Sequence, residues 1–297
     1  MTDDLLTIRD HLRYAVSEFG KAGLVYGHGA ANAVDEAAFL LLEALALPID
    51  DINPWLDARL TAPERSRLAE LIAARIETRK PAAYLVNKAY IQGVPFYVDE
   101  RVIVPRSFLG ELMLGEEIFP PAPDPEAVSS VLDLCTGSGC LAILAAFAFP
   151  NAEIEAVDLS ESALDVAARN VAEHELEDRI ILHKGDLFAP LGKARFDLIV
   201  TNPPYVDAEA MAGLPPEYRA EPELALAGGD DGLDIVRRII EEARERLTDD
   251  GALVCEIGTG RDILETDYPD LNFVWLDTEE SEGEVFWLSA EDLAAAN

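Results

Sequence analysis

The sequence contains few cysteines, histidines and lysines. These shortages argue against disulfides and metal sites, against histidine-based catalysis, and against nucleic acid binding. Its three cysteines, Cys135, Cys140 and Cys255, lie inside apolar segments at spacings that match no zinc site, and their odd number argues against a disulfide framework. Its four histidines are scattered along the chain, which disfavours a metal site or a histidine-based catalytic centre. We therefore expect small, buried cysteines and no bound metal.

The sequence also lacks a long hydrophobic run. Its longest apolar stretch, Leu141–Phe149, is far too short to cross a membrane. The first residues, Met1-Thr2-Asp3-Asp4, are acidic where a secretory signal begins with basic residues. Because 49% of the 297 residues are apolar and no low-complexity tract is present, we expect a soluble, cytoplasmic protein with one large and one smaller domain.

Positive charge is scarce. The chain has 57 acidic and 23 basic residues, a formal net charge of −34, and only five lysines. Such a surface repels phosphate groups, so direct nucleic acid binding is not expected. An acid excess with few lysines is typical of proteins that stay soluble in concentrated salt, which suggests a halophilic source. The alternative is that the acidic surface attracts a basic partner protein, and both hypotheses stay open.

The first 81 residues are predicted to form a small helical domain. Apolar residues recur there at helical spacing in three stretches, and Asp35 is placed to cap the second. The predicted helices cover residues 4–19, 35–47 and 63–79.

The next segment, residues 82–105, changes to β-type residues. They begin at Tyr84 and are interrupted by Gly93 and Pro95, which predicts a β-hairpin connector. Residues 106–297 would then form the larger, catalytic domain.

From residue 128 onward, strand patterns alternate with helical ones. This alternation predicts a parallel sheet with helices on both faces. The last two strands are joined by Asp277–Glu284, which is too short for a helical crossover and predicts an antiparallel final strand. The predicted strands are Val128–Leu134, Ile154–Val157, Ile180–Leu182, Phe196–Val200, Ala252–Ile257, Phe273–Leu276 and Val285–Leu288, and the helices cover about 139–149, 161–173 and 232–247.

The most informative motif is the tetrapeptide Asn-Pro-Pro-Tyr at 202–205, directly after the strand pattern at 196–200. It suits the methylation of a planar nitrogen, whose delocalised lone pair attacks a methyl donor poorly. The Asn202 side-chain oxygen and the Pro203 carbonyl can accept from the N–H groups of that nitrogen. Pro203 and Pro204 stiffen the turn, and Tyr205 offers a flat face. The alternative is a proline-rich loop with Asn202 as a turn residue.

A glycine-containing turn follows the first predicted strand of the sheet. In Asp133-Leu134-Cys135-Thr136-Gly137-Ser138-Gly139, the glycines let the backbone approach a ligand, and the next helix presents its N-terminus to it. The turn does not meet the dinucleotide-binding fingerprint, because Cys135 stands in place of the first glycine and no third glycine follows at the required offset.

Two carboxylates follow the next two strands. Asp158 can accept from both hydroxyls of a ribose, and Asp186 can accept from an adenine amine while Leu187 covers the ring. Their alternative role is that of ordinary helix caps. With Asn202 and the glycine turn they predict an S-adenosylmethionine pocket at the carboxyl edge of the sheet. The cofactor-binding candidates are Asp133, Thr136, Gly137, Ser138, Gly139, Asp158, Asp186, Leu187 and Asn202.

These motifs resemble those of the class I S-adenosylmethionine-dependent methyltransferases, and the tetrapeptide resembles that of the N5-glutamine methyltransferases among them. The resemblance implies an α/β fold: a seven-stranded Rossmann-like catalytic sheet with a small N-terminal helical domain and a β-hairpin connector. The family has a branch that modifies release factors and a branch that modifies the third protein of the large ribosomal subunit. Tyr26-Gly27-His28-Gly29, Pro105-Arg106-Ser107, Cys135 and the stretch 216–232 resemble the ribosomal-protein branch.

The resemblance implies that a glutamine of this basic ribosomal protein is methylated, with the helical domain, residues 1–81, docking it before or during ribosome assembly. It implies that Asn202 and Pro203 grip the amide and that Tyr205 packs on it, with Pro204 and Arg106 also in the substrate site. Glu111 would support Arg106. The alternatives are a release-factor glutamine, an adenine-N6 or guanine-N2 of a nucleic acid, and an acidic escort protein without activity.

Overall fold

The computed structural model describes residues 4–115, 124–279 and 281–295, and the chain forms two compact units. The first unit combines Met1–Ala89 with Val98–Glu100 and Leu214–Ala220. The second unit contains the remaining residues. The expected connector at 82–105 is therefore divided between the two units. In addition, a short segment that follows the Asn-Pro-Pro-Tyr motif belongs to the first unit.

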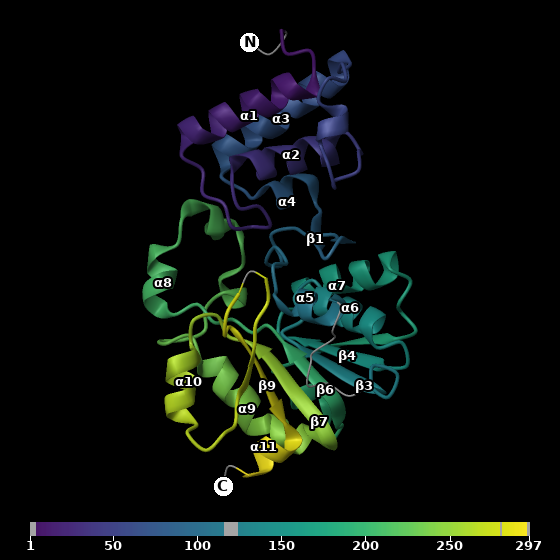
Figure 1. The fold of residues 1–297 in the computed structure, drawn as a ribbon, viewed down its shortest axis with the longest axis vertical. Coiled ribbons are helices and arrows are strands. Elements are labelled where there is room, and N and C mark those ends of the chain that lie inside the picture. Colours follow the sequence, from purple (N-terminus) through teal and green to yellow (C-terminus); the bar gives the residue numbers. More distant parts are fainter. Residues whose placement is uncertain (1–3, 116–123, 280, 296–297) are drawn as a thin grey trace. The chain divides into compact units, whose positions relative to one another are not determined.

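Helices make up most of the first unit, as the sequence predicts. Their apolar faces pack into two small clusters that include Phe19, Leu40 and Leu68. A Thr7 capping box begins the first helix, and Gly23 in the left-handed conformation ends it. The helices are α1 (Ile8–Ala22), α2 (Ala33–Ala44), α3 (Ala62–Thr78) and α4 (Ala82–Val86), with a 3₁₀ turn at Asn53–Trp55 (Figure 1).

Two local predictions in this unit are wrong. Asn32 caps α2 in place of Asp35, because the Asn32 side chain accepts hydrogen bonds from the backbone N–H groups of Val34 and Asp35. The first β-type residues, at 84–86, belong to the helix α4, in which Ala82, Ala83 and Tyr84 are buried, and the strands of the expected hairpin begin only at Ala89. Burial in the tertiary structure outweighs the β-propensity of these side chains.

The segment Leu214–Ala220 is fixed in the first unit by a buried carboxylate. Glu217 is fully buried and accepts hydrogen bonds from the Val25 N–H at 3.1 Å and from the Arg79 guanidinium at 3.0 Å. Burial by itself raises the pKa of Glu217, but these donors hold that pKa below its ordinary value. The carboxylate is therefore charged at neutral pH and links segments 192 residues apart in the chain.

The next residue, Tyr218, packs on the loop Tyr26-Gly27-His28-Gly29. The rings of His28 and Tyr218 lie 4.3 Å apart between centroids. Gly27 has φ +137°, and a Cβ at this position would lie 2.6 Å from the Tyr218 hydroxyl, so a larger residue does not fit. Two stretches that resemble the ribosomal-protein branch in sequence are thus in contact in the structure.

The second unit is built on a seven-stranded sheet of order β5-β4-β3-β6-β7-β9-β8 (Figure 1). The first five strands are parallel to their neighbours, and β9 runs antiparallel to both β7 and β8. All seven predicted strands and the antiparallel final strand are confirmed. The strands are β3 (Ser130–Leu134), β4 (Glu153–Asp158), β5 (Ile180–Lys184), β6 (Phe196–Thr201), β7 (Leu247–Glu256), β8 (Val274–Leu276) and β9 (Val285–Ser289), and β1 (Ala89–Ile91) and β2 (Val94–Phe96) form a separate hairpin.

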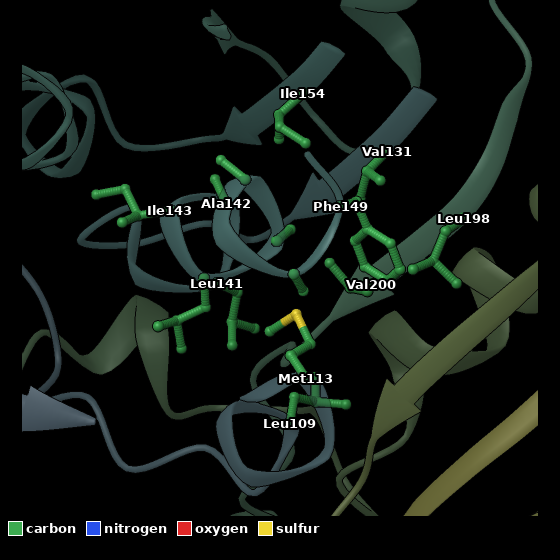
Figure 2. Packing of buried hydrophobic residues seen from close by; sticks show 14 of the residues in the cluster. Leu109, Met113, Val131, Leu141, Ala142, Ile143, Phe149, Ile154, Leu198 and Val200 are labelled. Carbon is green, nitrogen blue, oxygen red and sulfur yellow. The ribbon is translucent and has the colours of Figure 1, made fainter. Parts of the chain in front are cut away.

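Each face of this sheet carries its own hydrophobic core. Side chains alternate between the faces, so that Leu198 and Val200 pack with α5 and α6 while Ile199 packs with α9 and α11. Figure 2 shows the first of these cores. The remaining elements are α5 (Leu109–Leu114), α6 (Cys140–Ala148), α7 (Glu161–Glu173), a 3₁₀ turn at Ala189–Leu191, α8 (Ala208–Gly213), 3₁₀ turns at Pro216–Ala220 and Glu223–Ala225, α9 (Asp234–Arg246), α10 (Arg261–Asp267) and α11 (Ala290–Ala295).

The long apolar stretch of the sequence is the helix α6. Of its residues, all but Phe147 are buried, because the sheet covers one side and α5 covers another (Figure 2). Within the described residues, no helix is long and apolar enough to pass through a membrane.

We predict that Glu217→Ala frees the segment Leu214–Ala220 from the first unit. The change leaves the Val25 N–H without its acceptor and removes the carboxylate that pairs with Arg79, at a cost of about 2 kcal/mol. Trypsin should then cut after the exposed Arg219 about ten times faster than in the wild type, as followed by mass spectrometry. The matched control is Glu223→Ala, an exposed carboxylate just downstream, which should leave the rate unchanged. Equal rates in Glu217→Ala and wild type would contradict the anchoring role.

Candidate active site

The strands β3 and β6 lie side by side where the strand order reverses. Their register pairs Leu134 with Thr201, and the Thr201 hydroxyl donates to the Leu134 carbonyl at 2.9 Å. Ligands of open α/β sheets bind at this switch point, beyond the carboxyl ends of the strands. The glycine turn that follows Leu134 and the tetrapeptide that follows Thr201 therefore begin next to each other.

A pocket with about 900 Å³ of empty space, open solvent at its mouth included, lies at this edge of the sheet. Its lining is mostly apolar and includes Val157, Ile103 and Ile235. Six of the residues predicted for the site line it: Gly137, Asp158, Asp186, Leu187, Asn202 and Pro204.

Asp158 joins the glycine turn to the end of β4. Its Oδ2 accepts from the Gly137 N–H at 2.8 Å, and its Oδ1 accepts from the Ser160 N–H at 2.8 Å. Burial raises the pKa of Asp158 above its ordinary value, against the effect of these two donors. Each oxygen keeps a further lone pair, so the carboxylate can still accept from hydroxyl groups in the pocket. The helix that follows is capped by Ser160 and not by Asp158.

Asp186 forms an ion pair with a residue of α9. The Arg238 guanidinium donates to Asp186 Oδ2 at 2.9 Å, and both side chains are about half exposed. The next residue, Leu187, is buried and adopts φ +48°, which turns the chain tightly after β5. The ion pair fixes a carboxylate at the end of the pocket without using all of its acceptor capacity.

Asp133 lies beneath the glycine turn and does not line the pocket. It is fully buried, and its Oδ2 accepts from the Thr136 hydroxyl and from the Ala142 N–H. Its Oδ1 has no partner among the described residues, and burial raises the pKa of Asp133 to about 7. The carboxyl thus joins the turn to the first residues of α6.

The other turn residues also lie behind the pocket wall. Thr136 and Ser138 are buried, and Gly139 begins α6 in the left-handed conformation. Cys135 does line the pocket, and its φ of +57° explains why a glycine is expected at this position.

Asn202 and the turn around it differ from an ordinary proline-rich loop. The Asn202 side chain is half-buried in the pocket wall and makes no hydrogen bond with any described residue. Pro203 is buried and Pro204 lines the pocket. An asparagine that merely stabilises a turn would bond to the nearby backbone, so its free amide is available to a ligand.

Tyr205 is held by groups from two segments, the end of β7 and the glycine stretch at 228–232. Its hydroxyl donates to the buried Glu256 at 3.0 Å. A Cβ on Gly258 would lie 3.0 Å from the Tyr205 ring, and a Cβ on Gly232 would lie 2.4 Å from the Tyr205 carbonyl oxygen. Burial and the neighbouring Glu256 raise the pKa of Tyr205 well above its ordinary value. The phenol is therefore a hydrogen-bond donor and not a base.

Arg106 pairs with Glu221 in place of the expected Glu111. Two guanidinium nitrogens bind the two oxygens of Glu221 at 2.6 and 2.9 Å, and Glu221 also accepts from the Val104 N–H. Glu111 instead accepts from the Glu279 N–H. Arg106 does not line the pocket, and it ties the loop after the tetrapeptide to the segment at 104–106.

Comparison with known proteins identifies relatives of this chain. A family model described as methyltransferase small domain matches residues 115–213. The ribosomal protein uL3 glutamine methyltransferase of Bradyrhizobium diazoefficiens is 60% identical, covering 98% of this chain and 92% of that protein. Those of Burkholderia pseudomallei (55% identical, 97% and 96% covered) and Bordetella pertussis (54%, 98% and 97%) are also similar over nearly their full lengths.

The chain belongs to the family of ribosomal protein uL3 glutamine methyltransferases. The resemblance drawn from the motifs is confirmed, and so is the class I methyltransferase fold.

Several residues that line the pocket are not predicted from the sequence. The loop after the tetrapeptide supplies Pro222, Leu224, Ala225 and Ala227, and the segment at 101–103 supplies another wall. These are mostly apolar side chains, which carry no chemical signal in a sequence, and Arg238 belongs to an otherwise ordinary amphipathic helix. The usable signals are the resemblance of the stretch 216–232 to the ribosomal-protein branch and its glycines at 228–232, which indicate close backbone approach.

We predict that Gly232→Ala lowers the free energy of unfolding in urea by about 2 kcal/mol or more. Gly232 adopts φ +82°, and its new Cβ would overlap the Tyr205 carbonyl. The matched control is Gly213→Ala in the same inter-strand segment, where nothing lies within 4 Å of the added Cβ. The control should be within about 0.5 kcal/mol of the wild type. Similar losses in both variants would contradict this explanation.

A second prediction concerns pH. In the folded state Asp133 titrates at about 7, above its ordinary value of 3.8, so between these values the folded protein binds more protons than the unfolded chain. The wild type should therefore lose stability relative to Asp133→Asn as pH rises from 4 to 8, by up to about 4 kcal/mol. The variant keeps an oxygen for Thr136 and Ala142. A stability difference that stays constant across this range would disprove the assignment.

Proposed function

We propose that this chain transfers a methyl group from S-adenosylmethionine to the side-chain amide nitrogen of a glutamine in ribosomal protein uL3. The observation that carries the proposal is the free side-chain amide of Asn202 in the wall of the pocket. The side chain is half-buried at the pocket wall, so its amide can form a hydrogen bond with a polar group of a substrate. Family membership supports glutamine as that substrate.

The pocket has the donor and acceptor pattern that the cofactor requires. S-Adenosylmethionine presents ribose hydroxyls and an adenine amine, which are donors, and a flat apolar ring. Asp158 would accept from the ribose, Asp186 would accept from the amine, and Leu187 would cover the ring. The methionine end is assigned to the glycine turn, where Asp133, Thr136, Ser138 and Gly139 shape the backbone from behind.

The tetrapeptide would act by orientation and charge stabilisation. The cofactor supplies a methyl group on a positively charged sulfur. Asn202 and the Pro203 carbonyl accept from the N–H groups of the glutamine amide, which aligns its nitrogen and stabilises the positive charge that develops on it. Methyl transfer would form a nitrogen–carbon bond with the sulfur as leaving group, and the amide proton would pass to water. Tyr205 packs on the planar amide, and Pro204 borders it.

We assign substrate docking to the first unit, because the segment after the catalytic turn is anchored there by Glu217. Charge does not explain this docking. Residues 1–81 contain 13 acidic and 9 basic residues, whereas residues 106–297 contain 42 acidic and 12 basic residues. Residues 1–81 are thus only slightly acidic, and the catalytic part carries most of the field that attracts a basic protein. The substrate would be free uL3 in the cytoplasm, before or during ribosome assembly.

The test is transfer of label from S-adenosylmethionine in parallel to free uL3, a peptide-chain release factor and total RNA, each at low and molar salt. We expect label on a glutamine of uL3 alone, located by tandem mass spectrometry. Label on the release factor would support glutamine methylation but would assign the chain to the release-factor branch of the family. Label on RNA would retain the role of the tetrapeptide and overturn the substrate class.

We predict that Asn202→Ala lowers kcat by about a hundredfold or more, because it removes an acceptor for the substrate nitrogen. The affinity for S-adenosylmethionine, measured by calorimetry, should change by much less. The exposed Asn272→Ala in the same unit serves as the control and should retain full activity. A wild-type kcat in Asn202→Ala would remove the side chain from the mechanism.

A further inference from the structure

We propose that Glu256 is a positioning residue for methyl transfer, acting through Tyr205. This inference rests on the proposed function, because it concerns the same reaction. Glu256 is the last residue of β7, whose neighbour β6 leads into the tetrapeptide, and the register pairs Thr201 with Cys255. Its carboxylate is thus built into the sheet directly beside the catalytic turn.

The carboxylate of Glu256 is buried without an ion pair to any residue that the structure describes and is held there by hydrogen bonds alone. The side chain is 1% exposed and makes no ion pair with any described residue, which is a costly arrangement for an acidic group. Three donors compensate for the lost water: the Tyr205 hydroxyl at 3.0 Å on Oε1, and the Ser107 hydroxyl at 2.6 Å and the Phe108 N–H at 3.0 Å on Oε2.

This set of donors suits a carboxylate, which can accept on both oxygens. An amide in its place offers a single acceptor oxygen and points an NH₂ group at one of the existing donors. The Phe108 N–H cannot reverse its role, so a glutamine would turn its oxygen toward Phe108 and Ser107. The Tyr205 oxygen would then have to accept from the NH₂ group, and its own O–H proton would lose its acceptor. Glutamine at position 256 therefore reverses the bond that orients Tyr205 while keeping the remaining contacts.

The bond to Glu256 completes the fixation of the Tyr205 ring. Gly258 packs tightly against the ring, and Gly228 and Gly232 pack against the Tyr205 backbone too closely to accept a Cβ. These contacts restrict where the ring can lie, whereas the directional bond to Glu256 sets how it is turned. A planar substrate amide needs a ring of defined orientation beside it, and small displacements of a positioning group cost large factors in rate.

The same carboxylate joins the turn to a distant segment. Ser107 and Phe108 immediately precede α5, which packs on α6, and α6 begins at the glycine turn. Glu256 thus connects the catalytic turn to the helix pair behind the cofactor turn. We therefore expect a change of Glu256 to alter the orientation of the reacting groups more than the affinity for cofactor or substrate.

The test is a double-mutant cycle on kcat with Tyr205→Phe, Glu256→Gln and the combined variant, using S-adenosylmethionine and uL3. Each single variant should lower kcat by about tenfold or more, with the KM for S-adenosylmethionine within about twofold of the wild type. The combined variant should be no slower than the slower single variant, because both changes act on the same bond. Losses that multiply in the combined variant would overturn the proposal.

Ser107→Ala is the matched control, because it removes another hydrogen bond to the same carboxylate and leaves the bond to Tyr205. It should lower the thermal midpoint while keeping kcat within about threefold of the wild type. A loss in Ser107→Ala as large as that in Glu256→Gln would mean that the carboxylate only maintains the fold, and the proposal would fail.

Two outcomes separate this proposal from the proposed function. If the wild type does not methylate uL3, both fail together. If the wild type is active and Tyr205→Phe retains the wild-type kcat, only the role of Glu256 is lost. Tyr205→Phe removes a single hydroxyl, so this arm decides the question even if Glu256→Gln does not fold.

Discussion

The pairing of β3 with β6 is the constraint on which the site depends. The two strands are separated by about sixty residues of chain, yet their register places Leu134 opposite Thr201, and the Thr201 hydroxyl bonds to the Leu134 carbonyl. Both strands end at this level, so the turns that follow them open into one pocket. A shift of this register by one residue would turn every side chain to the opposite face and separate the turns.

Buried carboxylates then join segments that the sheet alone does not hold. Glu217 fixes the loop after the tetrapeptide in the first unit, Glu221 ties it to Arg106, and Glu256 holds Tyr205. A carboxylate can accept several hydrogen bonds, and the cost of burying it is offset only when all its donors are in place. Each therefore specifies one arrangement of the chain more sharply than an apolar contact would.

The acidic residues are unevenly distributed between the two parts of the chain. The large acid excess belongs to residues 106–297, whereas the first unit is nearly balanced. A basic substrate would thus be attracted by the part that carries out the chemistry, while the anchored segment Leu214–Ala220 links that part to the first unit through the chain itself. Halophilic adaptation and attraction of a partner both remain hypotheses for the same surface.

The sequence by itself determined the class of fold, the family and the residues that end each strand of the site. Strand periodicity, the glycine turn and the tetrapeptide are local patterns, and local patterns persist without knowledge of the tertiary contacts. Tertiary structure alone decided that Arg106 pairs with Glu221, that Arg238 holds Asp186 and that Glu256 holds Tyr205. These partners lie dozens to more than a hundred residues apart, and only chain folding brings a donor to an acceptor over such separations.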